Sequence, residues 1–327
     1  MKNEIGWGIL GPGKIAQSFA NDLKLVDEGN LVAAASRNLE RAETFAADFG
    51  AEKAFGSYEE LFTCDEVDVI YVATPHTGHM DWAVKAMQAG KHVLCEKPLG
   101  INLSEVEKMI SVAKESNVFL MEALWSRFNP SIQKVKECID SGELGKVSYI
   151  HADFAFYGLD RDEGGRILNP DLAGGSILDI GIYPIFLAYL ILGKPERIQS
   201  TSNFHKTGAE IQTSMIFNYE SAQAILYSGL TTNSEMRAEI QGDKGSIFID
   251  PRWHETQGFS FIKGESKERN DLPTLGKGYS YEIEEVHACL RAGKLQSELW
   301  SHQNSIDLIG LLDEVRRQSG VVFPFEE

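Results

Sequence analysis

The sequence predicts an α/β fold in two parts: an N-terminal doubly wound parallel sheet, then an α+β domain with an open, mainly antiparallel sheet. Up to about residue 122, short apolar runs alternate with helical periods, which is typical of βαβ units. The first apolar run leads directly into a glycine-rich turn at residues 11–16. In the second half most runs alternate apolar and polar residues, the pattern of strands with one buried and one exposed face.

The length of the chain favours two domains, because 327 residues are too many for a single core. We expect one domain over residues 1–122 and a second over residues 123–327, with the C-terminal helices packed back on the first. The net charge of −17 argues against nucleic acid and against an anionic membrane surface as partners, since both require clustered Lys and Arg.

In the first part, strands are expected at residues 5–10, 31–35, 67–73, 92–95 and 118–121, and helices at 15–26, 41–48, 82–89 and 103–115. A connecting helix near 131–141 leads to strands expected at 147–157, 198–204, 211–219, 222–228, 237–241, 246–250 and 259–263. The segment 242–245 has the composition of a hairpin turn. A helix near 176–192 interrupts these strands, and helices at 281–292 and 304–318 close the chain. Helices on one face of this sheet leave its other face open to a second subunit.

The turn after the first strand carries the G-x-G-x-x-A form of the dinucleotide fingerprint, in residues Gly11, Pro12, Gly13, Lys14, Ile15 and Ala16. The first glycine permits a tight turn, the second lets backbone N–H groups approach a pyrophosphate, and the alanine lets the helix pack close to the strand. The helix that follows directs its N-terminal N–H groups and its dipole at the phosphates. Glycine-rich turns are common, but this one lies between a strand and a helix, which favours a Rossmann-type dinucleotide-binding domain.

The end of the second strand indicates which dinucleotide binds. An NAD site would place Asp or Glu there for the ribose hydroxyls, whereas this chain has Ser36 and Arg37, with Arg41 one turn into the next helix. A hydroxyl and guanidinium groups suit the 2′-phosphate of NADP. The alternative is that Arg37 is only a solvated surface residue. We expect NADP as the cofactor, with NAD as the second choice.

Cysteine and histidine spacing argues against a metal site. The four cysteines include no C-x-x-C pair, which fits free thiols in a reducing cytoplasm. His76 and His79 are three residues apart, yet no third ligand lies at metal-binding spacing. The N-terminus leads into the first strand, and the longest apolar stretch, residues 177–192, is too short and interrupted to span a bilayer. We therefore expect a cytoplasmic protein that binds no metal.

One segment that can supply chemistry follows the strand at residues 92–95. Ligands of a doubly wound sheet bind beyond the carboxyl ends of its strands, so residues 73–76 and 96–98 lie on the cofactor side. Lys97 is placed to reach a substrate, and Pro98 restricts it to an extended backbone. The alternative role of Lys97 is an ordinary ion pair with Glu96 or with another surface acid.

The other segment, residues 174–184, contains Asp179 and Tyr183, which share one face if the segment is helical. Tyr183 is a candidate proton donor or acceptor. A phenol has an ordinary pKa near 10, so this work at neutral pH would need a neighbouring ammonium such as that of Lys97. The alternative is a core tyrosine whose hydroxyl binds a backbone carbonyl.

Together these motifs resemble the Gfo/Idh/MocA oxidoreductase family. The resemblance is carried by residues 11–16, by Glu96-Lys97-Pro98 and by the run from Asp179 to Tyr183. Within the family, the chain is most similar to the branch of dimeric dihydrodiol dehydrogenases and NADP-dependent D-xylose dehydrogenases, through residues 36–37, 56–61, 94–98, 119–125 and 314–317. The likeness runs almost from end to end of the chain.

The resemblance implies a catalytic pair, Lys97 and Tyr183, in a catalytic site that includes Asp179. In members that carry His at the position of Tyr183, the residue matching Asp179 orients that His. Beyond the fingerprint and residues 36, 37 and 41, the expected cofactor contacts are Thr74, Pro75, His76, His79, Glu96, Lys97, Trp125 and Arg127. The expected substrate pocket consists of Trp125, Phe156, Asp179, Tyr183 and Trp253, the last capping it from the second domain.

The function that the resemblance implies is hydride transfer between NADP and a secondary alcohol or carbonyl of a sugar or cyclic diol. The same resemblance, with the open sheet face, implies a homodimer. Two alternatives stay open. One is a non-catalytic dinucleotide-binding regulatory protein, against which the retained Lys97, Asp179 and Tyr183 argue. The other is a reductase of an imine or a linear tetrapyrrole.

Overall fold

The computed structural model describes residues 4–326, which form two compact units. The first unit runs to Phe128 and also contains Leu275–Ile306. The second comprises Asn129–Thr274 and the chain from Asp307 onward. The C-terminal part of the sequence is therefore divided between the two units, so each unit is assembled from segments that lie far apart in the chain.

The first unit is built on a six-stranded sheet in the order β3-β2-β1-β4-β5-β6, in which every neighbouring pair is parallel. Its strands are β1 (Ile5–Leu10), β2 (Gly29–Ala35), β3 (Lys53–Phe55), β4 (Val69–Val72), β5 (His92–Glu96) and β6 (Leu120–Ala123). This confirms the predicted doubly wound parallel sheet. The strand order reverses between β1 and β4, and such a reversal opens a ligand-binding crevice at the carboxyl ends of the strands.

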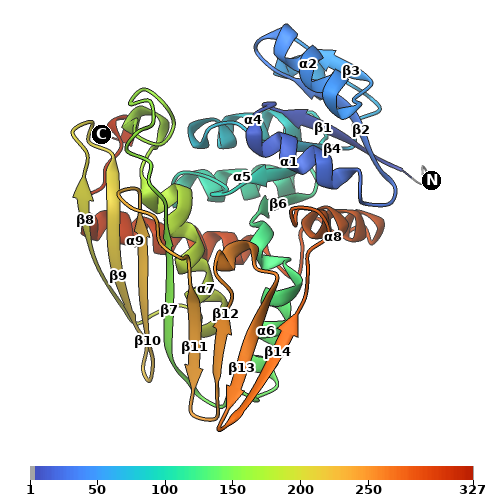
Figure 1. The fold of residues 1–327 in the computed structure, drawn as a ribbon. Coiled ribbons are helices and arrows are strands. Elements are labelled where there is room, and N and C mark those ends of the chain that lie inside the picture. The colour runs from blue at the N-terminus through green and yellow to red at the C-terminus, as the bar shows by residue number, and fades with distance from the viewer. Residues whose placement is uncertain (1–3, 327) are drawn as a thin grey trace. The chain divides into compact units, whose positions relative to one another are not determined.

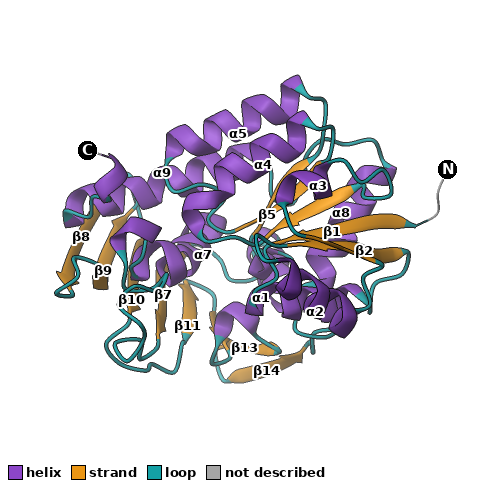
Figure 2. Cartoon of the chain, turned by 90° about the horizontal axis from the view of Figure 1, so that it is seen from above, coloured by secondary structure: helices purple, strands orange, loops and turns teal. Residues whose placement is uncertain are grey.

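Helices cover both faces of this sheet. They are α1 (Lys14–Leu23), α2 (Leu39–Phe49), α3 (Tyr58–Phe62), α4 (His79–Gln88), α5 (Leu103–Glu115) and α8 (Ser280–Arg291). Figure 2 shows α4 and α5 on one face and α1 and α2 on the other. Side-chain caps begin three of the helices: Asn38, Ser57 and Asn102 accept hydrogen bonds from the backbone N–H groups of the first turn.

Helix α8 comes from the end of the chain and completes this unit by packing on α1. The buried Trp7 of β1 donates its indole N–H to Nε2 of His287 on α8, at 2.9 Å. The short β3 and α3 were not expected from the sequence. Each residue of β3 is only half-buried, so this strand carries no apolar run that a pattern could reveal.

The second unit is built on an eight-stranded sheet in the order β14-β13-β12-β11-β7-β10-β9-β8 (Figure 1). Its strands are β7 (Val147–Ala155), β8 (Arg197–Phe204), β9 (Glu210–Asn218), β10 (Gln223–Gly229), β11 (Ala238–Gly242), β12 (Ser246–Ile249), β13 (Gly258–Lys263) and β14 (Ser266–Asp271). Only β7 and β10 are parallel neighbours among these strands, which confirms the mainly antiparallel sheet. The fully polar edge strand β14 was not expected, because it has no apolar face.

Two neighbouring rows of residues paired across the strands show that one face of this sheet is buried and the other is not. One row is buried across seven strands: Ile198, Phe217, Ala224, Ile150, Ile240, Ile247 and Phe261. The adjacent row is half-buried or exposed: Gln199, Ile216, Ile225, His151, Glu239, Phe248 and Ser260. We call the face that carries the second row the open face.

The helices of this unit cover the buried face. They are α6 (Pro130–Asp140), α7 (Ile182–Leu192) and the part of α9 (His302–Ser319) that follows residue 306. Helix α7 packs on β7 and β10, and α6 packs on α7 and β13. The last turns of α9 pack on β8, where Gln318 donates to the carbonyl of Ile198 at 2.9 Å. No helix among residues 4–326 is long and apolar enough to cross a membrane.

Candidate functional site

The turn between β1 and α1 strongly favours glycine at its first position. Gly11 has φ = +91°, which L side chains rarely adopt. Its N–H donates to the carbonyl of Ala35 at 3.1 Å, and a Cβ there would lie 3.0 Å from the carbonyl oxygen of Ala73. The turn is therefore held between the carboxyl ends of β2 and β4, beside the point where the strand order of the sheet reverses.

Gly13 has a different environment, since a Cβ placed on it would meet nothing within 4 Å. It is the N-cap residue of α1, and no side chain caps this helix. No side chain therefore covers the first N–H groups of α1 at Gly13, and uncapped N–H groups at a helix N-terminus can bind a phosphate. Lys14 and Ile15 are exposed, whereas Ala16 is fully buried. These residues fit the pyrophosphate of a dinucleotide.

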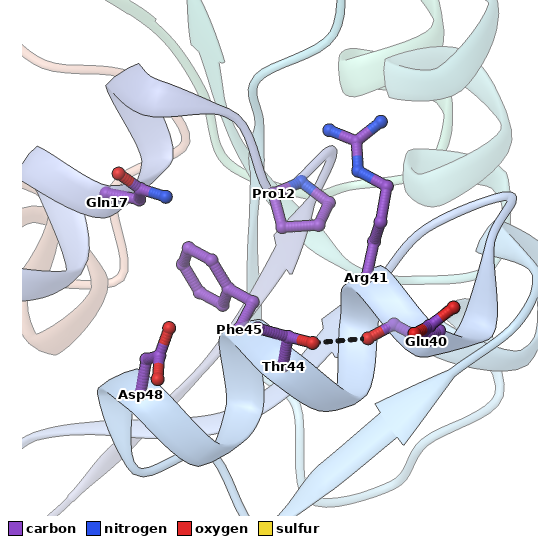
Figure 3. A pocket seen from close by; sticks show the side chains of 7 residues that line it. All are labelled: Pro12, Gln17, Glu40, Arg41, Thr44, Phe45 and Asp48. Atoms are coloured by element: carbon purple, nitrogen blue, oxygen red, sulfur yellow. Dashed lines mark hydrogen bonds between the residues drawn. The ribbon is translucent and has the colours of Figure 1, made fainter.

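The end of β2 presents one buried hydroxyl and two exposed guanidinium groups. Ser36 is buried and accepts a hydrogen bond from the N–H of Asn38 at 3.2 Å. Arg37 and Arg41 are both exposed; Arg37 lies directly before the N-cap of α2 and Arg41 lies in the first turn of that helix. A pocket of about 320 Å³ lies between α1 and α2 beside the turn (Figure 3), lined by Pro12, Gln17, Glu40, Arg41, Thr44, Phe45 and Asp48.

His79, at the start of α4, connects the two loops that follow β4 and β5. Its Nδ1 lies 2.8 Å from the carbonyl oxygen of Pro98 and its Nε2 lies 3.0 Å from that of Thr74. Burial lowers the pKa of His79 to about 4, and the charge of Lys97 acts in the same direction. A neutral imidazole has one N–H, so it donates to only one of these two carbonyls at neutral pH.

The side chain of Glu96 is directed into the unit. It accepts a hydrogen bond from the hydroxyl of Tyr71 and another from the N–H of Lys97, the latter at 3.2 Å. Lys97 is half-buried at the end of β5, and the Lys97–Pro98 bond is cis. The ring of His76 lies 5.7 Å from that of His79, while Pro75 is exposed. The first unit thus brings these two loops together at the carboxyl ends of β4 and β5.

Trp125 is buried after β6 and stacks on Tyr279, with ring centroids 4.7 Å apart and planes at 7°. The carboxylate of Asp22 fixes the segment before Tyr279 by accepting three backbone N–H groups, those of residues 277–279, at 2.8–2.9 Å. Arg127 donates Nε–H to the carbonyl of Leu299 at 2.9 Å. The sequence analysis missed Asp22 and Tyr279, because their separation of 257 residues leaves no local pattern.

In the second unit, Asp179 and Tyr183 lie one turn apart, as the spacing predicts. Asp179 is in a π-helical turn, Ile177–Gly181, and Tyr183 is in the first turn of α7. The buried Glu210 holds the start of this segment by accepting the N–H groups of Ser176 and Ile177 at 2.8 and 2.9 Å. Burial raises the pKa of Glu210 despite these bonds. π-Turns are rare in helices and are frequent at functional sites.

Aromatic rings surround Tyr183 within the second unit. Its ring centroid lies 5.5 Å from Phe154 and 5.3 Å from His254, which stack on each other at 4.1 Å. Trp253 is fully buried and donates its indole N–H to the carbonyl of Asp153 at 3.0 Å. Phe156 is half-buried just after β7. His254, which the sequence analysis did not select, lies next to the Tyr183 ring.

Arg166 also escaped the sequence analysis. Its Nη1 lies 2.7 Å from Oδ1 of Asp179, in an ion pair between a side chain that is 52% exposed and one that is 10% exposed. No spacing rule connects the two residues, because the intervening loop is irregular. No group of three or more His, Cys, Asp or Glu residues that could hold a metal occurs within residues 4–326.

Comparison with protein families gives two matches along the chain. A model described as an oxidoreductase family with an NAD-binding Rossmann fold matches residues 5–124. A model of the Gfo/Idh/MocA C-terminal domain matches residues 132–248. The two matches cover the parallel sheet of the first unit and most of the antiparallel sheet of the second.

Curated relatives and solved structures extend along almost the whole chain. Trans-1,2-dihydrobenzene-1,2-diol dehydrogenases from Mus musculus and Xenopus tropicalis are 37% and 36% identical, over 97% of this chain and 98% and 99% of their own. A 3-ketoreductase from Actinomadura kijaniata, solved with NADP and TDP-benzene, is 26% identical with a TM-score of 0.87, over 97% of this chain and 98% of its own. An aldose-aldose oxidoreductase from Caulobacter crescentus, 24% identical over the same shares, has a TM-score of 0.88 and shows a similar fold.

Proposed function

Because the chain belongs to the Gfo/Idh/MocA oxidoreductase family, we propose that it transfers a hydride between NADP and a secondary alcohol or carbonyl of a sugar or cyclic diol. The observation that carries this proposal is the placement of Tyr183, a phenol one turn from the Asp179 carboxylate on a π-turn and helix start. The relatives at 36–37% identity act on a cyclic diol, as their name states.

NADP rather than NAD is favoured by the end of β2. Arg37 and Arg41 are exposed there, and no carboxylate occupies residues 36–38 to bind a ribose 2′-hydroxyl. The pyrophosphate would be held by the backbone at Gly13 and the first N–H groups of α1. A 3-ketoreductase 26% identical to this chain was solved with NADP, which agrees with this choice. NADP, when bound, supplies the hydride chemistry.

In this mechanism Tyr183 takes the proton of the substrate hydroxyl during oxidation and returns it during reduction. Lys97 hydrogen-bonds the same oxygen and favours the ionised phenol, while Asp179 helps to orient the substrate. In the first unit, the family resemblance assigns His76, Trp125 and Arg127 to the cofactor. In the second unit, it assigns Phe156 to the substrate. The buried His79 acts indirectly, by holding the loops of Thr74 and Pro98.

We further propose a homodimer that pairs through the open face of the second unit, in the cytoplasm. Three large apolar side chains of that face are exposed: Ile216, Ile225 and Phe248. Such a row on a sheet is typical of a protein interface. All four cysteines are buried and free, which suits a reducing compartment.

The catalytic proposal is tested by replacing Tyr183 with Phe and measuring NADP⁺ reduction with a panel of sugars and cyclic diols. Turnover should fall by roughly 10²–10⁴-fold, the usual contribution of a general acid–base group. Tyr189→Phe is the matched control, since Tyr189 lies on the same helix and bonds Asp307 at 2.9 Å. Equal turnover in wild type and Tyr183→Phe would refute the role of Tyr183.

The cofactor proposal is tested by titrating NADPH and NADH against the tryptophan fluorescence of the protein. Replacing both Arg37 and Arg41 with Ala should weaken NADPH binding by roughly 10–100-fold, because two charge-assisted contacts to a phosphate are lost. NADH binding should be unaffected and serves as the internal control. Tight NADPH binding without turnover of any substrate would favour the non-catalytic regulatory protein.

A further inference from the structure

We propose that Arg166 is a specificity-determining residue, whose guanidinium binds the hydroxyl adjacent to the one that reacts. The inference rests on the proposed function and deepens it, since it commits the site to neutral substrates with two neighbouring hydroxyl groups. Two observations carry it: Arg166 forms an ion pair with Asp179, and Asp179 lies one turn before Tyr183.

The two partners of this ion pair differ in exposure. The Asp179 side chain is 10% exposed and that of Arg166 is 52% exposed, with Nη1 and Oδ1 2.7 Å apart. The carboxylate thus fixes the guanidinium from the buried side. A guanidinium carries five N–H donors in a rigid plane, so the bond to Asp179 sets the direction of the others.

The loop that carries Arg166 is fixed within the second unit. The N–H of Asn169 donates to Gly165 at 3.1 Å, and that of Gly174 donates to Asn169 at 3.0 Å. Leu168 is fully buried, and its carbonyl accepts the hydroxyl of Thr207 at 2.6 Å. Arg166 therefore approaches Asp179 from an anchored segment, and little ordering entropy is lost when the guanidinium meets a ligand.

The other end of the ion pair is equally well fixed. Glu210 holds the N–H groups of Ser176 and Ile177, directly before the turn that carries Asp179. Tyr183 follows Asp179 by four residues, so its ring starts about one helical turn away, roughly 6 Å along the axis. Asp179, which binds the guanidinium, and Tyr183 thus lie on one short segment whose start is fixed by Glu210.

Charge decides which substrate this arrangement suits. The ion pair has no net charge, and the Asp179 carboxylate would repel an anionic substrate group placed next to the guanidinium. A hydroxyl can donate to a carboxylate and accept from a guanidinium, so it satisfies both partners. Vicinal hydroxyls lie on adjacent carbon atoms, which lets Tyr183 act on one while Arg166 binds the other.

The experiment compares two substrates that differ only in the second hydroxyl, trans-cyclohexane-1,2-diol and cyclohexanol, in NADP⁺ reduction. Replacing Arg166 with Met should lower kcat/KM for the diol by roughly 10–100-fold more than for cyclohexanol, since only the diol loses a hydrogen bond to a charged group, whereas loss of the ion pair with Asp179 affects both substrates alike. Arg166→Lys should recover part of the diol preference.

Arg161→Met is the matched control, because Arg161 is an exposed arginine of the same loop whose ion pair with Asp160 is 3.8 Å long. It should leave both substrates unaffected. Equal loss for both substrates in Arg166→Met, or no loss for either, would overturn the role of Arg166 while the wild type remained active. Failure of the wild type to oxidise these two alcohols and every sugar and cyclic diol of the panel would overturn the proposed function, and with it this inference.

Discussion

At the scale of single residues, Gly11 and Gly13 stand two positions apart in one turn but are constrained by different things. Gly11 has a positive φ and lies against the backbone of Ala73. Gly13 has φ −98° and ψ −171°, values open to any residue, and has open space where a Cβ would lie. The protein itself therefore requires glycine at residue 11, whereas only a ligand requires it at residue 13.

This difference predicts opposite outcomes for two alanine substitutions. Gly11→Ala should lower the free energy of unfolding by roughly 1–3 kcal/mol, because it forces a positive φ on a residue with a Cβ. Gly13→Ala should fold normally and weaken NADPH binding about tenfold or more, because its methyl group takes the space of the approaching pyrophosphate. Urea denaturation and fluorescence titration measure the two effects. Full NADPH affinity in Gly13→Ala would exclude this turn as the phosphate site.

Structural elements are held in place here by single buried side chains. Glu210, at the start of β9, accepts four hydrogen bonds: two from the N–H groups of Ser176 and Ile177, and two from the hydroxyls of Ser176 and Thr213. It thereby fixes the π-turn and helix that carry Asp179 and Tyr183. An N-terminal helix segment whose N–H groups lack acceptors is unstable when buried.

We expect Glu210→Ala to lower the free energy of unfolding by roughly 3–5 kcal/mol, since it leaves several buried donors without an acceptor. Glu210→Gln should cost less, because its amide oxygen still accepts hydrogen bonds. Glu220, an exposed residue after β9, supplies the control, and Glu220→Ala should change stability by less than about 0.5 kcal/mol. Chemical denaturation measures all three variants. Equal stability of Glu210→Ala and wild type would contradict this account.

His79 fixes two loops in a similar way, and its pKa predicts how stability depends on pH. The folded protein keeps this imidazole neutral down to pH about 4, whereas the unfolded chain binds a proton near pH 6.5. The unfolded state therefore binds more protons between these values, and stability falls as the pH is lowered through that window. The difference between the two pKa values corresponds to about 3 kcal/mol in the free energy of unfolding.

The measurement is the free energy of unfolding of wild type and His79→Asn from pH 7 to pH 4. Above pH 6.5 the wild type should be more stable, because the variant lacks the imidazole between Thr74 and Pro98. Its advantage should shrink by about 3 kcal/mol as the pH approaches 4. A difference that does not change with pH would mean that His79 keeps its ordinary pKa in the folded protein.

At the scale of the whole molecule, the open face of the second unit predicts the oligomeric state. Ile216 and Ile225 are directly paired across β9 and β10 and are 39% and 42% exposed. Sedimentation velocity at micromolar concentration should give about twice the 36.3 kDa of one chain. Ile225→Asp should shift the protein to the monomer, because it places a charge in an apolar interface.

The matched control for this prediction is Val322→Asp, a change at a residue that is 61% exposed outside the sheet. The control should remain dimeric, and both variants should bind NADPH as wild type does. A monomeric wild-type protein at these concentrations would refute the homodimer. A dimer that survives Ile225→Asp would assign the interface to another surface.

The sequence predicts most of this fold because most elements are set by local patterns. Apolar runs mark β1, β4 and β5, and the alternating residues of β9 and β10 mark a sheet with one buried face. Among the strands and α-helices of residues 4–326, β3, α3 and β14 were not predicted, since they are short or lack an apolar face. The helix expected at 176–192 begins as the π-turn Ile177–Gly181 and continues as α7, and Glu210 accepts the N–H groups of Ser176 and Ile177 at its start.

By itself the sequence determined the glycine turn, the missing carboxylate after β2 and the four-residue spacing of Asp179 and Tyr183, because each depends on neighbours along the chain. Only the tertiary structure decided the contacts that support them. Trp125 meets Tyr279, and Arg166 meets Asp179, across separations that no helical or strand period records. The physical reason is that burial and hydrogen bonding are satisfied by whichever side chains the fold brings together, so these partners leave no trace in local sequence.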